Sequence, residues 1–158
     1  MSEHTRSSTT KGSGTAGPRE VFVYGDAEGF LQEVTVGPHR LAADEPKDVG
    51  GNDEGPTPYD LLLAALGSCT SITVTMYAQR KGWPLQGVGT WLRHSRIHAG
   101  DCAECETKEG KLDQIELDIE FYGALSDEQR SKLLEVAKKC PVHRTFTTEN
   151  VIRTRATQ

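Results

Sequence analysis

The chain has 158 residues, 35% of them hydrophobic, and a formal net charge of -5. It is long enough to bury a core without disulfide cross-links. Its negative charge argues against nucleic acid as the main partner and supplies no polybasic membrane anchor. No uninterrupted apolar run approaches the ~20 residues of a membrane span, so no membrane partner is expected.

Residues 1–18 are rich in Ser, Thr and Gly and lack the apolar core of a signal peptide. We expect them to form a flexible N-terminal tail, with residues 19–158 as a single domain. Four cysteines without a secretory signal indicate a reducing compartment, which predicts a cytoplasmic protein.

Strands are predicted at the start of the domain. Glu20 to Tyr24 and Phe30 to Val36 flank a Gly-containing turn and predict a hairpin, and His39 to Ala43 would add a third strand. A loop, Gly51 to Pro56, then leads into the longest apolar segment.

That segment predicts a helix that begins after Thr57 and stops at Gly82, which Pro84 follows. Thr57 is a candidate N-cap, Pro58 suits the first helical position, and Asp60 stands three residues after the cap. Residues 61–66 are apolar on every face, which predicts burial all round.

Helical spacing within this segment bears on Cys69. The stripe that shares a face with it consists of Leu62, Leu66, Cys69, Thr73 and Met76, which places the thiol on the packed side. Gly67 and Ser68 next to Cys69 allow a close approach, either by another backbone or by a small substrate. A buried cysteine is also an ordinary packing residue, so both interpretations stay open.

A second hairpin is predicted from Val88 to His98 and from Leu112 to Tyr122, because apolar and acidic residues alternate along the latter. His94 and His98 are four apart on the first of these strands, so both face one side. Cys102 and Cys105, in the connecting loop, have the spacing of a zinc knuckle or a redox dithiol. The two histidines and two cysteines could bind zinc, and a loop disulfide or free thiols are the alternatives.

The last part of the chain carries the fourth cysteine. Ser126 and Gln129 form a capping-box pattern that opens a helix running to about Lys139. Pro141 can open a new helix with Cys140 as its N-cap. That position and the neighbouring basic residues favour the thiolate form of Cys140.

His143 is a candidate general acid or an incidental surface histidine. Val151 to Arg155 is expected to close the sheet. The order of elements predicts an α+β fold in which an antiparallel sheet packs on a long buried central helix.

Two motifs resemble the OsmC/Ohr family of hydroperoxide reductases: Gly55-Pro-Thr-Pro-Tyr-Asp-Leu-Leu-Leu-Ala-Ala-Leu-Gly-Ser-Cys-Thr70 and Cys140-Pro-Val-His143. Shorter segments resemble its OsmC-like branch: Asp44-Glu-Pro46, Gly50-Gly51, Met76-Tyr-Ala78 and Lys81-Gly-Trp-Pro84. The similarity runs from about Val21 to Arg155. It implies a small α+β domain that forms an intertwined homodimer, with active sites at the subunit interface.

The resemblance also implies a redox cycle. Cys69 would be the thiol that attacks an organic hydroperoxide, and Cys140 would resolve the resulting sulfenic acid as a disulfide. A dithiol or a lipoylated protein would then reduce that disulfide, and no bound cofactor is required. On this basis we expect an antioxidant thiol peroxidase. The local sequence favours the thiolate form of Cys140, but the family assigns the attack on the peroxide to Cys69, and we follow the family.

The chain departs from the family at the activating pair. The best-understood members carry a Glu that pairs with an Arg, whereas Tyr59 occupies the Glu position here, with Asp60 beside it. Arg40 is the nearest substitute for the Arg, or an ordinary strand residue. The rival hypothesis is therefore a non-catalytic redox- or metal-binding module that uses His94, His98, Cys102 and Cys105.

Overall fold

The computed structural model describes residues 20–157, which form two compact units, residues 20–55 and residues 56–157. The predicted tail, residues 1–18, lies outside the described residues, and the single domain over 19–158 stays a prediction. Each unit is considered by itself.

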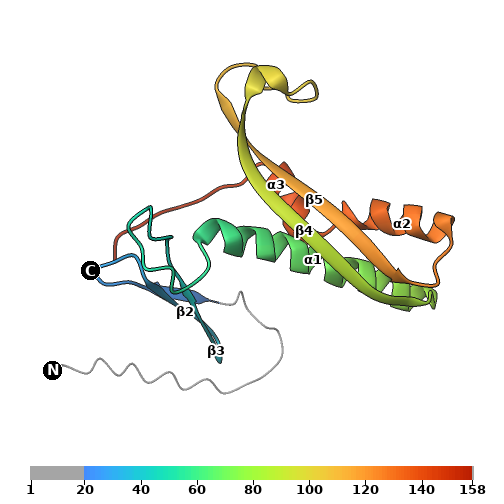
Figure 1. Ribbon diagram of the computed structural model, residues 1–158, viewed down its shortest axis with the longest axis horizontal. Helices are drawn as coiled ribbons and strands as arrows, with labels where there is room; N and C mark the ends of the chain where they lie inside the picture. The colour runs from blue at the N-terminus through green and yellow to red at the C-terminus, as the bar shows by residue number, and fades with distance from the viewer. Residues whose placement is uncertain (1–19, 158) are drawn as a thin grey trace. The chain divides into compact units, whose positions relative to one another are not determined.

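The first unit contains three antiparallel strands in the order β1 (Val21–Tyr24), β2 (Gln32–Val36) and β3 (His39–Ala43) (Figure 1). Val34, at the centre of β2, is buried and pairs with Val23 on one side and Leu41 on the other. The three predicted strands are therefore confirmed, with β2 beginning two residues later than expected.

A buried carboxylate organises the loop that follows β3. Asp44 accepts backbone N–H bonds from Glu45 at 2.8 Å, from Asn52 at 3.0 Å and from Glu54 at 3.2 Å. Burial by itself would raise the pKa of Asp44, but the donated N–H groups outweigh it and hold the pKa below the ordinary value of 3.8. Gly51 is required here because a Cβ atom would collide with the carbonyl of Glu45.

The second unit begins with the helix α1 (Pro58–Lys81), which confirms the predicted start and stop. Thr57 and Asp60 form a reciprocal capping box, in which each side chain accepts the other residue's backbone N–H. Gly82 ends the helix at a φ of 65°, a left-handed conformation that glycine adopts without strain.

The remaining elements are a long hairpin and two short helices. Strands β4 (Leu85–His98) and β5 (Lys111–Gly123) are antiparallel, with the 3-10 helix η1 (Ala99–Asp101) at the tip. Figure 1 shows this hairpin running along α1 and its tip projecting beyond the helix. Helices α2 (Asp127–Ala137) and α3 (Pro141–Thr147) follow.

The hairpin packs on α1 at a glycine. A Cβ at Gly67 would lie 2.7 Å from Leu92 Cδ1 and 2.9 Å from Thr90 Oγ1, so only glycine allows this approach. The core beyond this point joins α1, β5 and α2 through Val74, Ala78, Phe121, Leu133 and Ala137. This confirms the α+β fold in which an antiparallel sheet packs on a helix, although residues 20–157 form two sheets rather than one.

Two details of the α1 prediction are wrong. The buried residues of α1 are Leu66, Gly67, Thr70, Val74 and Ala78, whereas Met76 of the predicted stripe is exposed. The buried face is therefore rotated by about one residue, and Cys69 is half-buried at its edge. Nor are residues 61–66 buried all round, because Leu62, Ala64 and Ala65 are exposed within the chain.

The prediction that Val151 to Arg155 closes the sheet is also wrong. These residues are described by the structure and form no strand. The physical reason is that β-branched residues such as Val151 and Ile152 form a strand only where another strand pairs with them, and residues 151–155 pair with none of the described strands.

By length and composition, α1 is apolar enough to cross a membrane, although its apolar residues do not form one uninterrupted run of that length. The central helix of a water-soluble fold meets the same criterion. Less than half of its most apolar stretch is buried within the chain, so this helix presents apolar surface that the single chain does not cover.

Candidate active site

Cys69 and Cys140 are the two cysteines of residues 20–157 that are not joined in a disulfide. Cys69 lies in the middle of α1, and Cys140 is the N-cap of α3, as predicted. The Cys140 sulfur is fully buried and accepts the backbone N–H of His143 at 3.3 Å.

Thr70 connects the two cysteines. Its Oγ1 lies 3.4 Å from Cys140 Sγ, and its side chain is itself buried. Because Thr70 follows Cys69 directly in α1, this contact places Cys140 against the turn of the helix that carries Cys69. Two segments far apart in the sequence are thus brought together at their cysteines.

A pocket of about 440 Å³ begins one helical turn from each cysteine. Leu66, three residues before Cys69, and His143, three residues after Cys140, both line it. The other lining residues come from α1, β4, β5 and α3: Tyr59, Leu62, His94, Asp113, Ile115, Leu117, Phe146 and Thr147. The pocket therefore has mainly apolar walls and borders the helical turns next to the two cysteines, although neither cysteine is among its lining residues.

Three polar side chains of the pocket gather near the start of α1. His94 Nε2 lies 3.0 Å from Asp113 Oδ1, and the His94 ring stacks on Tyr59 with ring centroids 4.3 Å apart. Arg96 adds a second contact to the same carboxylate oxygen at 3.5 Å. Tyr59 and Cys69 are ten residues apart on one helix, which separates them by about 15 Å along its axis.

The candidate supporting residues Asp60 and Arg40 have local partners. The Asp60 carboxylate accepts from both the backbone N–H and the hydroxyl of Thr57, so it caps α1. Arg40 lies in the first unit, where its guanidinium donates to the carbonyls of Gly37 and His39 at 3.1 Å.

The structure does not assemble the four predicted metal ligands. Cys102 and Cys105 are joined in a disulfide, their Cα atoms 5.4 Å apart, and His94 is held in the pocket by Tyr59 and Asp113. Among residues 20–157 no group of three or more His, Cys, Asp or Glu side chains is placed to hold a metal ion. Of the alternatives for the loop, the structure shows the disulfide.

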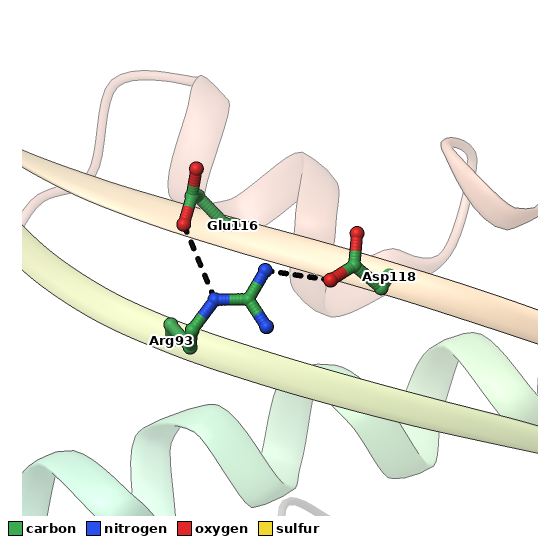
Figure 2. Close-up of polar contacts among 3 residues, drawn as sticks. All are labelled: Arg93, Glu116 and Asp118. Carbon is green, nitrogen blue, oxygen red and sulfur yellow. Dashed lines mark hydrogen bonds and ion pairs between the residues drawn. The ribbon is translucent and has the colours of Figure 1, made fainter.

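An exposed ion cluster crosses the hairpin outside the pocket. The Arg93 guanidinium lies between the carboxylates of Asp118, at 2.6 Å, and Glu116, at 3.3 Å (Figure 2). The hydrogen bond to Asp118 contributes most to raising the pKa of Arg93 above its ordinary value. All three side chains are exposed, so this cluster is a feature of the hairpin surface rather than of the site.

Sequence reasoning missed several residues of the site. Asp113 and Phe146 stand in no motif, and Thr70 ends the family motif but was given no role, because their importance arises from contacts between elements distant in the sequence. The position of Thr70 directly after Cys69 is the one signal that could have identified it.

A family comparison agrees with this geometry. The model of the OsmC-like protein family matches residues 50–155, about two thirds of the chain. The chain therefore belongs to the OsmC-like family. A comparison with curated protein sequences finds no significant match.

Solved structures share the fold at low identity. An OsmC-like protein from Mycoplasma pneumoniae has a TM-score of 0.65 at 18% identity, covering 84% of this chain and 89% of that one. An organic hydroperoxide resistance protein OsmC from Legionella pneumophila has a TM-score of 0.60 at 19% identity, covering 84% and 91%. An organic hydroperoxide resistance protein from Elizabethkingia anophelis has a TM-score of 0.61 at 18% identity, covering 83% and 89%.

Proposed function

We propose that this protein is a thiol-dependent peroxidase that reduces organic hydroperoxides through Cys69 and Cys140. Family membership supports a peroxide-related redox role, and two of the structural neighbours are named for organic hydroperoxide resistance. The observation that carries the proposal is the contact between Thr70 and the Cys140 sulfur. It places the unpaired thiol of Cys140 against Thr70, which directly follows the other unpaired cysteine, Cys69.

In the proposed cycle the Cys69 thiolate attacks the terminal oxygen of the hydroperoxide. The O–O bond breaks, Cys69 becomes a sulfenic acid, and the leaving alkoxide takes a proton to become the alcohol. The Cys140 thiol then attacks the sulfenic sulfur, forming a disulfide and releasing water. A dithiol or a dihydrolipoylated protein restores both thiols and is itself oxidised to a disulfide. No bound cofactor enters these steps.

The pocket supports an organic rather than an inorganic peroxide. Leu62, Leu66, Ile115, Leu117 and Phe146 supply an apolar wall that hydrogen peroxide would not use. An alkyl or aryl hydroperoxide could place its hydrocarbon part on this wall and its O–O group toward the cysteines.

Activation of Cys69 must differ from that in the best-understood family members, because Tyr59 replaces their Glu. His94 and Asp113 form a hydrogen-bonded pair on which Tyr59 stacks, yet about 15 Å of helix separates Tyr59 from Cys69 of the same chain. We therefore propose that this group acts on a site to which a second subunit contributes. The role of Arg40 stays a prediction of the resemblance.

A homodimer is the second part of the proposal. Exposed apolar side chains on α1 include Ile72, 59% exposed, and Met76, 55% exposed. Covering this surface with a second copy of the chain would remove it from water. Ile72→Lys should shift the protein toward monomer in sedimentation measurements, whereas Ser131→Lys, at an exposed position on α2, should not.

The test of the peroxidase is consumption of cumene hydroperoxide with dihydrolipoamide as the reductant. We expect Cys69→Ser to lower turnover to the rate without enzyme. Cys140→Ser should still release one equivalent of alcohol but form no intramolecular disulfide. Absence of turnover by the fully reduced wild-type protein would contradict the proposal for these substrates.

A further inference from the structure

We propose that Cys102 and Cys105 form a second redox centre, a dithiol–disulfide couple that exchanges electrons with an external dithiol. It is separate from the proposed peroxidase site and does not rest on that function. The couple lies in the loop between η1 and β5, at the tip of the β4–β5 hairpin.

Access favours exchange at this loop. Cys102 and Cys105 are both partly exposed, and the residues between and around them, including Ala103, Glu104 and Glu106, are exposed. Figure 1 shows the hairpin tip projecting away from α1, so a partner molecule can approach it. An exchange reaction requires such an approach, because the attacking thiolate must reach one of the two sulfurs.

A structural role does not explain the disulfide. A cross-link stabilises a fold mainly by closing a long loop, and this one joins residues only three apart in sequence. The hairpin is already paired as far as His98 with Lys111, and the Ala99 N–H donates to the Gly110 carbonyl at 2.9 Å. Reduction therefore leaves the base of the loop held by backbone hydrogen bonds.

Charge around the loop selects the partner. Four exposed carboxylates, of Asp101, Glu104, Glu106 and Glu109, surround the cysteines, against the two ammonium groups of Lys108 and Lys111. The excess of negative charge repels an anionic thiol such as glutathione and favours a neutral dithiol or one on a basic protein surface. We expect added salt to reduce this preference.

The exchange step balances as follows. A thiolate of the external dithiol attacks one sulfur of the Cys102–Cys105 disulfide, and the other sulfur leaves as a thiolate and takes a proton. The second thiol of the donor loses its proton and closes the donor's disulfide, which releases the first cysteine as a thiol. Two electrons and two protons thus pass from the donor to the protein.

The experiment uses the full chain with Cys69→Ser and Cys140→Ser, so that only this couple titrates. The protein is equilibrated in buffers with different ratios of reduced to oxidised dithiothreitol, quenched, alkylated and weighed by mass spectrometry. We expect one reversible transition between zero and two alkylated thiols. Reduction by dithiothreitol should be faster than reduction by an equal concentration of glutathione thiol, with a rate ratio that falls as salt is added.

A matched control carries Cys105→Ser in the same background and should retain one alkylated thiol at every ratio. The proposal would be overturned if Cys102 and Cys105 stayed oxidised, or stayed reduced, at every ratio of reduced to oxidised dithiothreitol. The proposal would also be overturned if the protein retained one equivalent of zinc through the titration and lost it in His98→Ala. That result would mean that Cys102 and Cys105 bind a metal ion. Because the test protein lacks Cys69 and Cys140, none of these outcomes depends on the peroxidase.

Discussion

The second unit carries two pairs of cysteines with opposite placements. Cys69 and Cys140 come from segments far apart in the sequence and lie in and beside the core, unpaired. Cys102 and Cys105 are three residues apart on an exposed loop and are joined. The comparison shows that short spacing in the sequence places the second pair within reach of each other, whereas packing of α1 against α3 decides what surrounds the first.

The largest predicted difference between the pairs is their rate of alkylation in the reduced native protein. Cys140 is fully buried, so its modification requires local opening, and we expect it to react slower than Cys102 by a factor on the order of 100 or more. Cys69, which is half-buried, should fall between them. Mass spectrometry of iodoacetamide time courses measures the rates; equal rates at Cys140 and Cys102 would contradict the comparison.

Gly67→Ala tests the packing that positions the first pair. The added methyl would meet Leu92 and Thr90 at less than 3 Å, so we expect a loss of about 1–3 kcal/mol in the free energy of unfolding. Urea titration followed by the fluorescence of Trp83 and Trp91 measures this loss. The control is Ser68→Ala at the exposed neighbouring position, because the Ser68 hydroxyl bonds back only to the carbonyls of Ala64 and Ala65 within α1. A stabilised Gly67→Ala protein would show that helix propensity outweighs the close approach.

Thr70→Val removes the hydroxyl that touches the Cys140 sulfur while keeping the side-chain shape. We expect a loss of about 1 kcal/mol, together with faster alkylation of Cys140. Thr73→Val is the matched control, because the Thr73 hydroxyl bonds only to the Cys69 carbonyl within α1. If both variants changed the Cys140 rate equally, the Thr70 contact would not be the cause.

Asp44→Asn perturbs the first unit and should leave both cysteine pairs unchanged. The folded-state pKa of Asp44 is lowered, so its ionised form stabilises the loop above pH 3.8. That contribution is lost as the pH falls from this value through the lower folded-state pKa. Hydrogen exchange at the amides of Asn52 and Glu54 should be faster in Asp44→Asn at pH 6. The difference from wild type should shrink in acid.

Arg93→Ala should have the smallest effect. Its ion pairs with Glu116 and Asp118 are exposed, and such pairs contribute little to stability in water. Neither the midpoint of urea unfolding nor the alkylation rate of Cys102 should change measurably. A large loss of stability would mean that the outer face of the hairpin is buried in the assembled protein.

The local elements could be predicted because their signals lie within a few residues. The capping boxes at Thr57 and Ser126, the stop at Gly82 and the cap at Cys140 are all correct. The hairpin strands follow from alternation, which the register of β4 and β5 confirms. The family was likewise predictable from its motifs, and the match over residues 50–155 confirms it.

The errors share one cause. Apolar spacing on α1 was consistent with more than one buried face. The hairpin packs on Gly67, and the face that is buried with Gly67 is the one that carries Thr70 and Val74. In the same way, Val151 to Arg155 begins with β-branched residues but pairs with none of the described strands.

The sequence by itself therefore determined the start and stop signals of the helices, most of the strands to within a few residues, and the family to which the chain belongs. Caps, turns and motifs are short-range features, so they are legible before folding. Only the tertiary structure decided that Thr70 touches Cys140, that the pocket begins one turn from each of the two free cysteines, and that His94 belongs to the pocket. Those relations arise from packing between elements distant in the chain, which no local pattern encodes.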